Sequence, residues 1–240
     1  IILATILCDI RSNILFKYLI SIILISIISL LLIAQPDIGQ TLLVVFCWAT
    51  LIFTSGINIY ILLAIFIAGA SLLTYLIIYV PRFDYIQGRI FSFFNRETGT
   101  HNFQSDKAIE SITSGGFFGK GIGEGVLKNR VPEAHTDYII SVISEEFGVV
   151  AIMLILLLFL ILIYMVFKKI SFETNDKVKL ILIGSISLIL MQATIHVGVN
   201  IRLFPTTGMT LPFLSYGGSS IISTSILAGI ILNLTKRKIT

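Results

Sequence analysis

Three residues suited to proton transfer or metal binding lie close together near the middle of the chain. Glu133, His135 and Asp137 occur where a polar stretch gives way to a long apolar run. If that run spans a membrane, a carboxylate at its edge is costly to keep charged, which indicates chemistry there. Glu133 and His135 are of the types that orient a base or hold a divalent cation. Coordination would require non-helical backbone, because alternate positions on a helix do not converge.

The apolar run that follows predicts a helix over 138–167, longer than a bilayer core demands. Its first turns are therefore expected at the interface or within protein. If the helix already begins at Pro132, polar and small residues recur along one face: Glu133, Asp137, Ser141, Glu145 and Gly148. That face would point into a polar cleft of the bundle. A structural pairing with a basic residue is the favoured role for Glu145 and Glu146, and a dipole-stabilised helix start is the structural alternative for Asp137.

A glycine-rich stretch over 114–125 precedes these residues and includes Gly115, Gly116 and Lys120. Its backbone amides could approach an anionic ligand, with Lys120 adding positive charge. A flexible turn explains the same composition equally well. The glycine spacing does not match a nucleotide-binding loop, so no ATP site is predicted.

The composition is that of an integral membrane protein, with 56% hydrophobic and 12% charged residues and a mean hydropathy of +0.99. Continuous rather than alternating apolar runs predict an all-α polytopic helix bundle. The expected spans lie near 18–34, 41–55, 59–79, 138–167, 178–197 and 219–235. The first residues resemble the tail of an earlier helix, and without an initial methionine the chain is interpreted as a fragment of one transmembrane domain over 1–240.

Basic residues gather at the span ends that alternation assigns to one side of the membrane. These are Arg11, Lys17, Lys168, Lys169, Lys177, Lys179, Lys236, Arg237 and Lys238. The positive-inside rule then places the C-terminus in the cytoplasm and the long loop over 81–136 outside. The net charge of +4 thus reflects topology and anionic headgroups, and no nucleic-acid partner is expected.

The loop over 81–136 is too long for a plain connector. Its first part mixes Arg82, Arg89 and Arg96 with aromatic residues, which is typical of an amphipathic segment in the outer interface. Clamping an anionic lipid headgroup is the alternative for these arginines.

A second unusual segment, 201–218, precedes the last span. Prolines and glycines interrupt it while it stays apolar, which predicts backbone that re-enters the membrane and is covered by protein. Arg202 is its one strong cation. The preceding helix carries polar side chains toward this end (Gln192, Thr194, His196 and Asn200), and His196 is interpreted as a hydrogen-bonded packing residue.

Four segments carry a family resemblance: QPDIGQT, GGFFGKGIG, PEAHTDYIISVISEEFG and FPTTGMTLPFLSYGGSS. They are similar to the signature segments of the SEDS family, the membrane proteins of shape, elongation, division and sporulation. They occur in the family's order from Gln35 onward. Within them, PEAHTD and GMTLPF are more similar to the division member of the family than to its rod-elongation member.

The resemblance implies ten transmembrane helices in a complete member, of which this chain would hold the last six and the end of the fourth. It implies a peptidoglycan glycosyltransferase that polymerises lipid II at the outer face of the cytoplasmic membrane. The expected partners are a class B penicillin-binding protein acting as transpeptidase and other divisome proteins. Members commonly carry lysine where this chain has Thr207, so that cation is either missing from this chain or supplied by Arg202.

The family places an essential aspartate at Asp137, and the reaction requires a base for an acceptor hydroxyl and cations for a lipid pyrophosphate. Asp137 is therefore the expected catalytic base. The expected substrate contacts are Glu133, His135, Lys120, Lys128, Arg130, Arg202, Gly115, Gly116 and Ser219. No metal ligand and no cofactor is assigned, and a divalent cation is left open.

Two other functions remain open at this point. A lipid II flippase would also use a polar cleft with intramembrane Glu145 and Glu146, and it would tolerate Asp137→Asn. A scaffold that only recruits the transpeptidase would tolerate Asp137→Ala.

Overall fold

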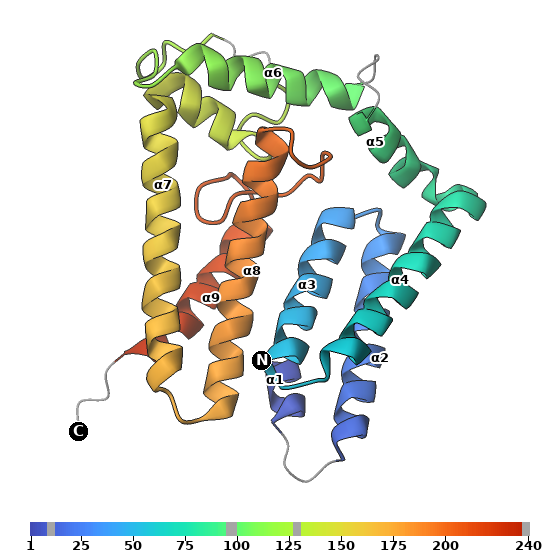
Figure 1. Ribbon diagram of the computed structural model, residues 1–240. Coiled ribbons are helices and arrows are strands. Elements are labelled where there is room, and N and C mark those ends of the chain that lie inside the picture. The colour runs from blue at the N-terminus through green and yellow to red at the C-terminus, as the bar shows by residue number, and fades with distance from the viewer. Residues whose placement is uncertain (9–12, 95–99, 127–130, 237–240) are drawn as a thin grey trace. The chain divides into compact units, whose positions relative to one another are not determined.

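The computed structural model of the chain describes residues 1–8, 13–94, 100–126 and 131–236. These residues form helices, turns and loops, with no strand among them (Figure 1). The elements in chain order are α1 (Ile2–Leu7), α2 (Ile14–Ala34), α3 (Ile38–Thr54), α4 (Ile59–Tyr79), η1 (Pro81–Phe83), α5 (Asp84–Phe94), α6 (Thr100–Gly115), α7 (Ile139–Phe172), α8 (Asp176–Asn200) and α9 (Gly218–Thr235). The prediction of an all-α fold is confirmed.

Five of the described helices are long and apolar enough to cross a membrane: α2, α4, α7, α8 and α9. The apolar helix α3 has 17 residues, at the lower end of the roughly 17 to 25 that span a bilayer. The six predicted spans correspond to these six helices. The chain is therefore a multi-pass membrane protein.

Local sequence signals set several helix ends. Asp37 caps α3, because its Oδ1 accepts a hydrogen bond from the Gln40 amide at 2.9 Å. Asn58 caps α4 in the same way. The helix α4 ends at Tyr79, and the next residue, Val80, is extended because the following Pro81 disfavours helical backbone.

The chain forms two compact units. Unit 1 comprises Ile1–Gln87, Val166–Leu188 and Leu227–Thr240, and unit 2 comprises Gly88–Met165 and Ile189–Ile226. The helices α7, α8 and α9 each contribute residues to both units. A single transmembrane domain over 1–240 stays a prediction.

Unit 1 is organised around α3. Trp48, Leu51 and Ile52 are buried there together with Leu180 of α8. The helices α3 and α8 approach closely at Gly184, where an added Cβ would lie 3.2 Å from the Leu51 side chain. Small residues at such crossings let the backbones of membrane helices approach closely.

Unit 2 contains most of the predicted outer loop, and much of that loop is helical. The amphipathic segment predicted around Arg89 forms α5, and its position at the membrane interface stays a prediction. The helix α6 was not predicted, and it runs across one end of unit 2 (Figure 1). Apolar contacts among Ile140 of α7, Ala193 of α8 and Leu211 lie in the interior of this unit.

The predicted continuous helix over 138–167 is wrong in one respect. Gly148 has φ 78° and ψ 177°, so α7 consists of a short helix before this residue and a long helix after it. The short helix is bent away from the long one (Figure 1). Ser141, Ser144 and Glu145 on the short helix are fully buried, as expected for first turns that lie within protein.

Candidate active site

The segment 131–138, which contains Asp137, is a turn and not a helix. The amides of Thr136, Asp137 and Tyr138 all point at the Glu133 carbonyl oxygen, at 3.1, 3.1 and 3.3 Å. Glu133 itself has φ 56°, a left-handed conformation that is rare outside glycine. The predicted helix start at Pro132 is therefore wrong, since α7 begins at Ile139. Glu133 and Asp137 do not lie on one helical face.

Three successive carbonyl groups of this turn are held by other parts of unit 2. The His135 carbonyl accepts from the Tyr216 amide at 2.9 Å, and the Thr136 carbonyl accepts from the Ser215 hydroxyl at 2.7 Å. The Asp137 carbonyl accepts from the Asn200 side-chain amide at 2.9 Å. The backbone that carries Asp137 is thus fixed by α8 and by the segment that follows it. Preorganisation of this kind is what a catalytic side chain requires.

A stripe of polar side chains on α8 holds the segment 201–218 in place, and the re-entry of this segment into the membrane stays a prediction. Gln192, His196 and Asn200 are spaced by four residues and share one face. Gln192 donates to the Thr210 carbonyl at 2.9 Å, and Nδ1 of His196 lies 2.7 Å from the Met209 carbonyl. These contacts satisfy carbonyls of a non-helical backbone inside an apolar surrounding. His196 is a hydrogen-bonded packing residue, as predicted.

The Asp137 side chain faces this segment. An added Cβ at Gly208 would lie 3.6 Å from Asp137 Oδ2, so glycine leaves space beside the carboxylate. Loss of water around the half-buried carboxyl raises the pKa of Asp137, and the negative charge of Glu133 raises it further. A hydrogen bond from Thr136 and the charge of Arg89 lower it. A raised pKa in a partly open site is typical of a general base.

Two arginines bring positive charge to this part of unit 2. Arg89 of α5 donates from Nη1 to the Thr206 carbonyl at 3.2 Å, two residues before Gly208. Arg202 forms an ion pair with Asp106 of α6, and its buried Nη2 has no hydrogen-bond partner among the described residues. Arg89 therefore supplies a cation beside Thr207, where the resemblance led us to expect lysine.

The glycine-rich stretch binds the bend in α7. The amides of Lys120 and Gly121 donate to the carbonyls of Glu145 and Glu146, at 2.9 and 3.0 Å. These are carbonyls that the bend at Gly148 removes from helical hydrogen bonding. The sequence left two roles open for this stretch, anion binding and a flexible turn. The structure shows the amides of Lys120 and Gly121 hydrogen-bonded to carbonyls within the protein.

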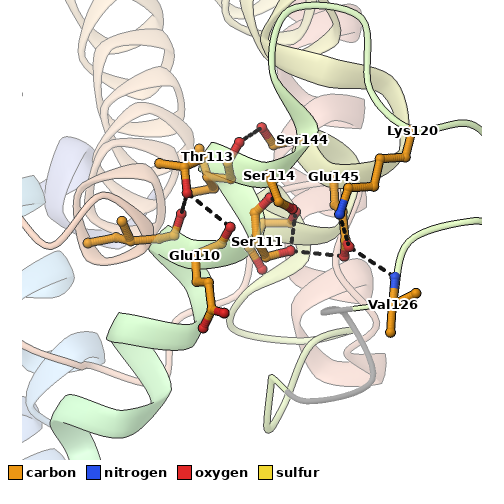
Figure 2. A network of polar contacts seen from close by, with 11 residues as sticks. Glu110, Ser111, Thr113, Ser114, Lys120, Val126, Ser144 and Glu145 are labelled. Atoms are coloured by element: carbon orange, nitrogen blue, oxygen red, sulfur yellow. Dashed lines mark hydrogen bonds and ion pairs between the residues drawn. The ribbon is translucent and has the colours of Figure 1, made fainter.

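The Glu145 carboxylate lies at the centre of the same network (Figure 2). It accepts from the Ser111 hydroxyl at 3.1 Å and from the Val126 amide at 3.0 Å, and it pairs with Lys120 Nζ at 3.4 Å. The favoured structural pairing of Glu145 is confirmed. Glu146 accepts from the Gly123 amide at 3.2 Å.

The other predicted substrate contacts are dispersed. Glu133 and His135 are exposed in the turn beside Asp137, and Ser219 is exposed in the first turn of α9. Gly115 is buried, with no room for a side chain, because an added Cβ would lie 1.9 Å from the Ser144 carbonyl oxygen. Gly116 is exposed, with φ 58°. Lys128 and Arg130 lie outside the described residues.

The turn over 131–138 meets the condition set for a metal site, because its backbone is non-helical. Even so, no group of three or more His, Cys, Asp or Glu side chains in the described part of the chain is placed to hold a metal ion. A divalent cation stays a prediction.

Sequence reasoning did not assign three residues that shape this site. Arg89 was considered only as an interfacial anchor or headgroup clamp, while Ser215 and Gly208 were read as part of a signature segment. Their contacts join residues about 70 to 120 positions apart, and one sequence without homologues contains no signal of such pairing.

The family comparison covers almost the whole chain. The model of the FtsW, RodA and SpoVE family, described as "Cell cycle protein", matches residues 1–239. A curated relative from Caulobacter vibrioides, a probable peptidoglycan glycosyltransferase FtsW, is 35% identical over 214 residues, which are 87% of this chain and 52% of the relative. A protein of the same description from Francisella salina is 37% identical over 221 residues, covering 88% of this chain and 53% of the relative. The chain thus spans about half the length of these relatives.

Two solved structures have a similar fold. A chain of a complex described under "Structural coordination of polymerization and crosslinking by a peptidoglycan synthase complex" matches with a TM-score of 0.76 at 27% identity, covering 97% of this chain and 65% of that one. An aspartate-to-alanine mutant of the rod-shape-determining protein RodA from Thermus thermophilus matches with a TM-score of 0.62 at 27% identity, covering 97% of this chain and 60% of that one.

Proposed function

Since the chain belongs to the FtsW, RodA and SpoVE family of cell cycle proteins, we propose that the protein is a peptidoglycan glycosyltransferase that polymerises lipid II. It would act during cell division, because the curated relatives with which it shares 31 to 37% identity are described as FtsW. The support from the structure is the fixed, half-buried carboxylate of Asp137 facing a non-helical segment with an arginine nearby.

Asp137 is the general base in this proposal. It accepts the proton of an acceptor sugar hydroxyl while that oxygen bonds to the anomeric carbon of the donor sugar. The bond between the anomeric carbon and the pyrophosphate oxygen breaks, and the lipid pyrophosphate leaves with the electron pair. A carboxylate with a raised pKa suits this role, because it accepts a proton more readily than an ordinary aspartate does.

Arg89 and Arg202 are the described cations that we assign to the pyrophosphate. Each guanidinium can donate two parallel hydrogen bonds to phosphate oxygens. The Thr206 carbonyl fixes Arg89, and the buried Nη2 of Arg202 has no hydrogen-bond partner among the described residues. Both would stabilise the negative charge that develops on the leaving group. Lys120 is less suited, because its ammonium belongs to the Glu145 network at the bend in α7.

The cellular setting follows from the same proposal. The protein lies in the bacterial cytoplasmic membrane with its C-terminus inside and the loop between α4 and α7 outside. It works with a class B penicillin-binding protein transpeptidase and with other divisome proteins. A chain that it resembles belongs to a complex that coordinates polymerization and crosslinking, which supports a transpeptidase partner.

The test is lipid II polymerisation by the purified protein as its gene encodes it, together with its transpeptidase partner. A β-lactam inhibits transpeptidation by the partner, so that the strands stay uncrosslinked and can be resolved on a gel. Glycan strands resolved on a gel are the expected result. The absence of glycan strands, together with intact transfer of lipid II across the membrane of vesicles, would contradict the proposal and favour a flippase.

The structure removes one argument for the flippase. Glu145 and Glu146, the intramembrane carboxylates that a transporter would use, accept hydrogen bonds from Lys120 and Gly123 of the glycine-rich stretch and from the Val126 amide that follows it. These hydrogen bonds give both carboxylates a structural role at the bend in α7.

A further inference from the structure

A half-open pocket of about 610 Å³ lies in unit 1, well within the size range of ligand sites. It forms where the end of α1, the start of α2, the end of α3 and the start of α8 meet. Three lysines contribute to its walls, namely Lys17, Lys177 and Lys179. The proposed catalytic base and its arginines belong to unit 2, so nothing in the proposed function uses this pocket.

Among the described residues, the pocket contains more positive charge than acidic side chains neutralise. Lys179 Nζ lies 3.2 Å from Asp176, the one acidic residue among the described lining residues. In the described part of the chain, Lys17 Nζ contacts a neutral group, the Leu7 carbonyl, at 3.4 Å. Lys177 forms no ion pair within the described part of the chain. Two ammonium groups therefore lack an acidic partner among these residues, and an anionic ligand would supply one.

The start of α8 adds to this positive field. The helix has 25 residues, and its first turn lines the pocket through Asp176, Lys177 and Lys179. The N-terminus of a helix carries about half a positive charge and favours anions. Asn175 caps it by accepting from the Lys177 amide at 3.0 Å.

The remaining walls identify the kind of anion. Leu180 and Ile183 are apolar residues of the membrane-spanning helix α8, and the apolar Leu7 lies at the end of α1. A pocket with basic residues at its mouth and apolar walls at the end of membrane helices matches a lipid with a charged headgroup. A free phosphate would use the lysines but not the apolar walls.

We propose that this pocket binds the phosphate-bearing headgroup of an anionic phospholipid. The lysines lie at helix ends that the positive-inside rule assigns to the cytoplasmic side, so the lipid comes from the inner leaflet. Occupancy would hold the ends of α1, α2, α3 and α8 that line the pocket together.

Cys8 offers a reporter inside the pocket. It is partly exposed in the lining, whereas Cys47, the other cysteine, is buried. Burial raises the pKa of the Cys8 thiol, as does the charge of Asp176, while Lys17 and Lys177 lower it. Cys8 lines the same pocket as the lysines that would hold the headgroup.

The test measures maleimide alkylation of Cys8, read by peptide mass spectrometry, on the protein as its gene encodes it. The protein is placed in nanodiscs of phosphatidylcholine, of phosphatidylcholine with phosphatidylglycerol, or of phosphatidylcholine with inorganic phosphate in the buffer. The test variant changes Lys17, Lys177 and Lys179 to Gln. The matched control changes Lys168 and Lys236 to Gln, two lysines of the same predicted side that are outside the pocket.

Phosphatidylglycerol should slow alkylation of Cys8 in the wild type and in the control, and the triple variant should lose most of this protection. Each lysine is expected to contribute about five-fold to the apparent affinity for the anionic lipid. If the triple variant misfolds, the single change Lys177→Gln replaces it as the test variant, because this exposed side chain forms no ion pair among the described residues.

Equal protection in wild type and lysine variants would overturn the proposal, as would no protection in any protein. Protection by inorganic phosphate in phosphatidylcholine alone would overturn the lipid assignment. None of these outcomes depends on glycan polymerisation, so the pocket can fail while the proposed enzyme activity stands.

Discussion

At the scale of single residues, the account depends on the carboxyl group of Asp137. Its backbone is fixed by Asn200, and its side chain is half-buried beside Gly208. The pKa is raised, so the charged form is disfavoured in the folded protein. The stability associated with a raised pKa is present below the unfolded value and is lost as pH rises through the folded value. At neutral pH the carboxylate therefore lowers stability, as is common for catalytic groups.

The pH dependence of activity should follow from this carboxyl group. Because a base works only when deprotonated, kcat/KM should rise with pH on the acid side, with a midpoint above the aspartate value of about 4. Arg89→Gln removes a charge that lowers the pKa of Asp137, so the midpoint should move to higher pH. Asp84→Asn, at an exposed carboxylate in the first turn of α5, is the control and should leave the midpoint unchanged. A midpoint insensitive to Arg89→Gln would contradict the proximity of the two groups.

Asn200 is a positioning residue, and its loss should affect turnover more than substrate binding. Its side-chain amide donates at 2.9 Å to the carbonyls of both Asp137 and His196. Asn200→Ala should lower kcat and destabilise the protein by about 1 to 3 kcal/mol, because buried carbonyls lose their donor. Steady-state kinetics and thermal unfolding in detergent measure both effects.

Thr194→Ala is the matched control for Asn200→Ala. This exposed hydroxyl on the same helix bonds only within its own turn, to the Leu190 carbonyl, so both quantities should stay near wild type. A raised KM with unchanged kcat in Asn200→Ala would argue against positioning.

At the scale of elements, the sequence predicted the apolar helices well and the breaks in them poorly. The runs that form α2, α4, α8 and α9 are uninterrupted, so length and hydropathy sufficed. The bend at Gly148 lies within an apolar run, and one glycine there is also compatible with a straight helix. The turn that carries Asp137 begins at Pro132, and proline is also common at the first position of a helix. Its shape depends on partners far along the chain, such as Ser215.

The bend in α7 requires glycine at position 148. Its φ of 78° disfavours any side chain, and an added Cβ would lie 2.1 Å from the Phe117 carbonyl oxygen. Gly148→Ala should therefore destabilise the protein by at least about 2 kcal/mol, combining backbone strain and overpacking. Thermal unfolding in detergent measures this.

Gly229→Ala in α9 is the matched control. An added Cβ there meets no atom within 4 Å and the backbone is helical, so this change should be neutral or slightly stabilising. Equal unfolding temperatures for Gly148→Ala and wild type would show that the bend is not required.

At the scale of the whole molecule, composition and charge predicted the class of protein, while motif resemblance predicted the family. Neither could predict which distant residues meet. Arg89 is 117 positions from Thr206, and one sequence shows no coupling between them. The resemblance placed Asp137, but only the structure shows three neighbouring carbonyls fixing its backbone.

The orientation of the chain in the membrane is testable with two reporters. The basic residues at the ends of α7 and α9 predict that a green fluorescent protein fused after Thr240 will fluoresce in the cytoplasm. Alkaline phosphatase inserted after Ile122, an exposed residue of the loop between α4 and α7, should be active outside. The opposite pair of results would reverse the topology and place Asp137 on the wrong side for glycan synthesis.

The most direct test of the account compares Asp137→Asn with wild type in both glycan-strand formation and thermal unfolding. We expect the polymerisation rate to fall by about 10² to 10⁴, the usual contribution of a general base, with an unfolding temperature equal to or above that of wild type. A rate within a few-fold of wild type would remove Asp137 from the mechanism. A lost rate accompanied by a clearly lowered unfolding temperature would contradict the claim that Asp137 serves catalysis at the expense of stability.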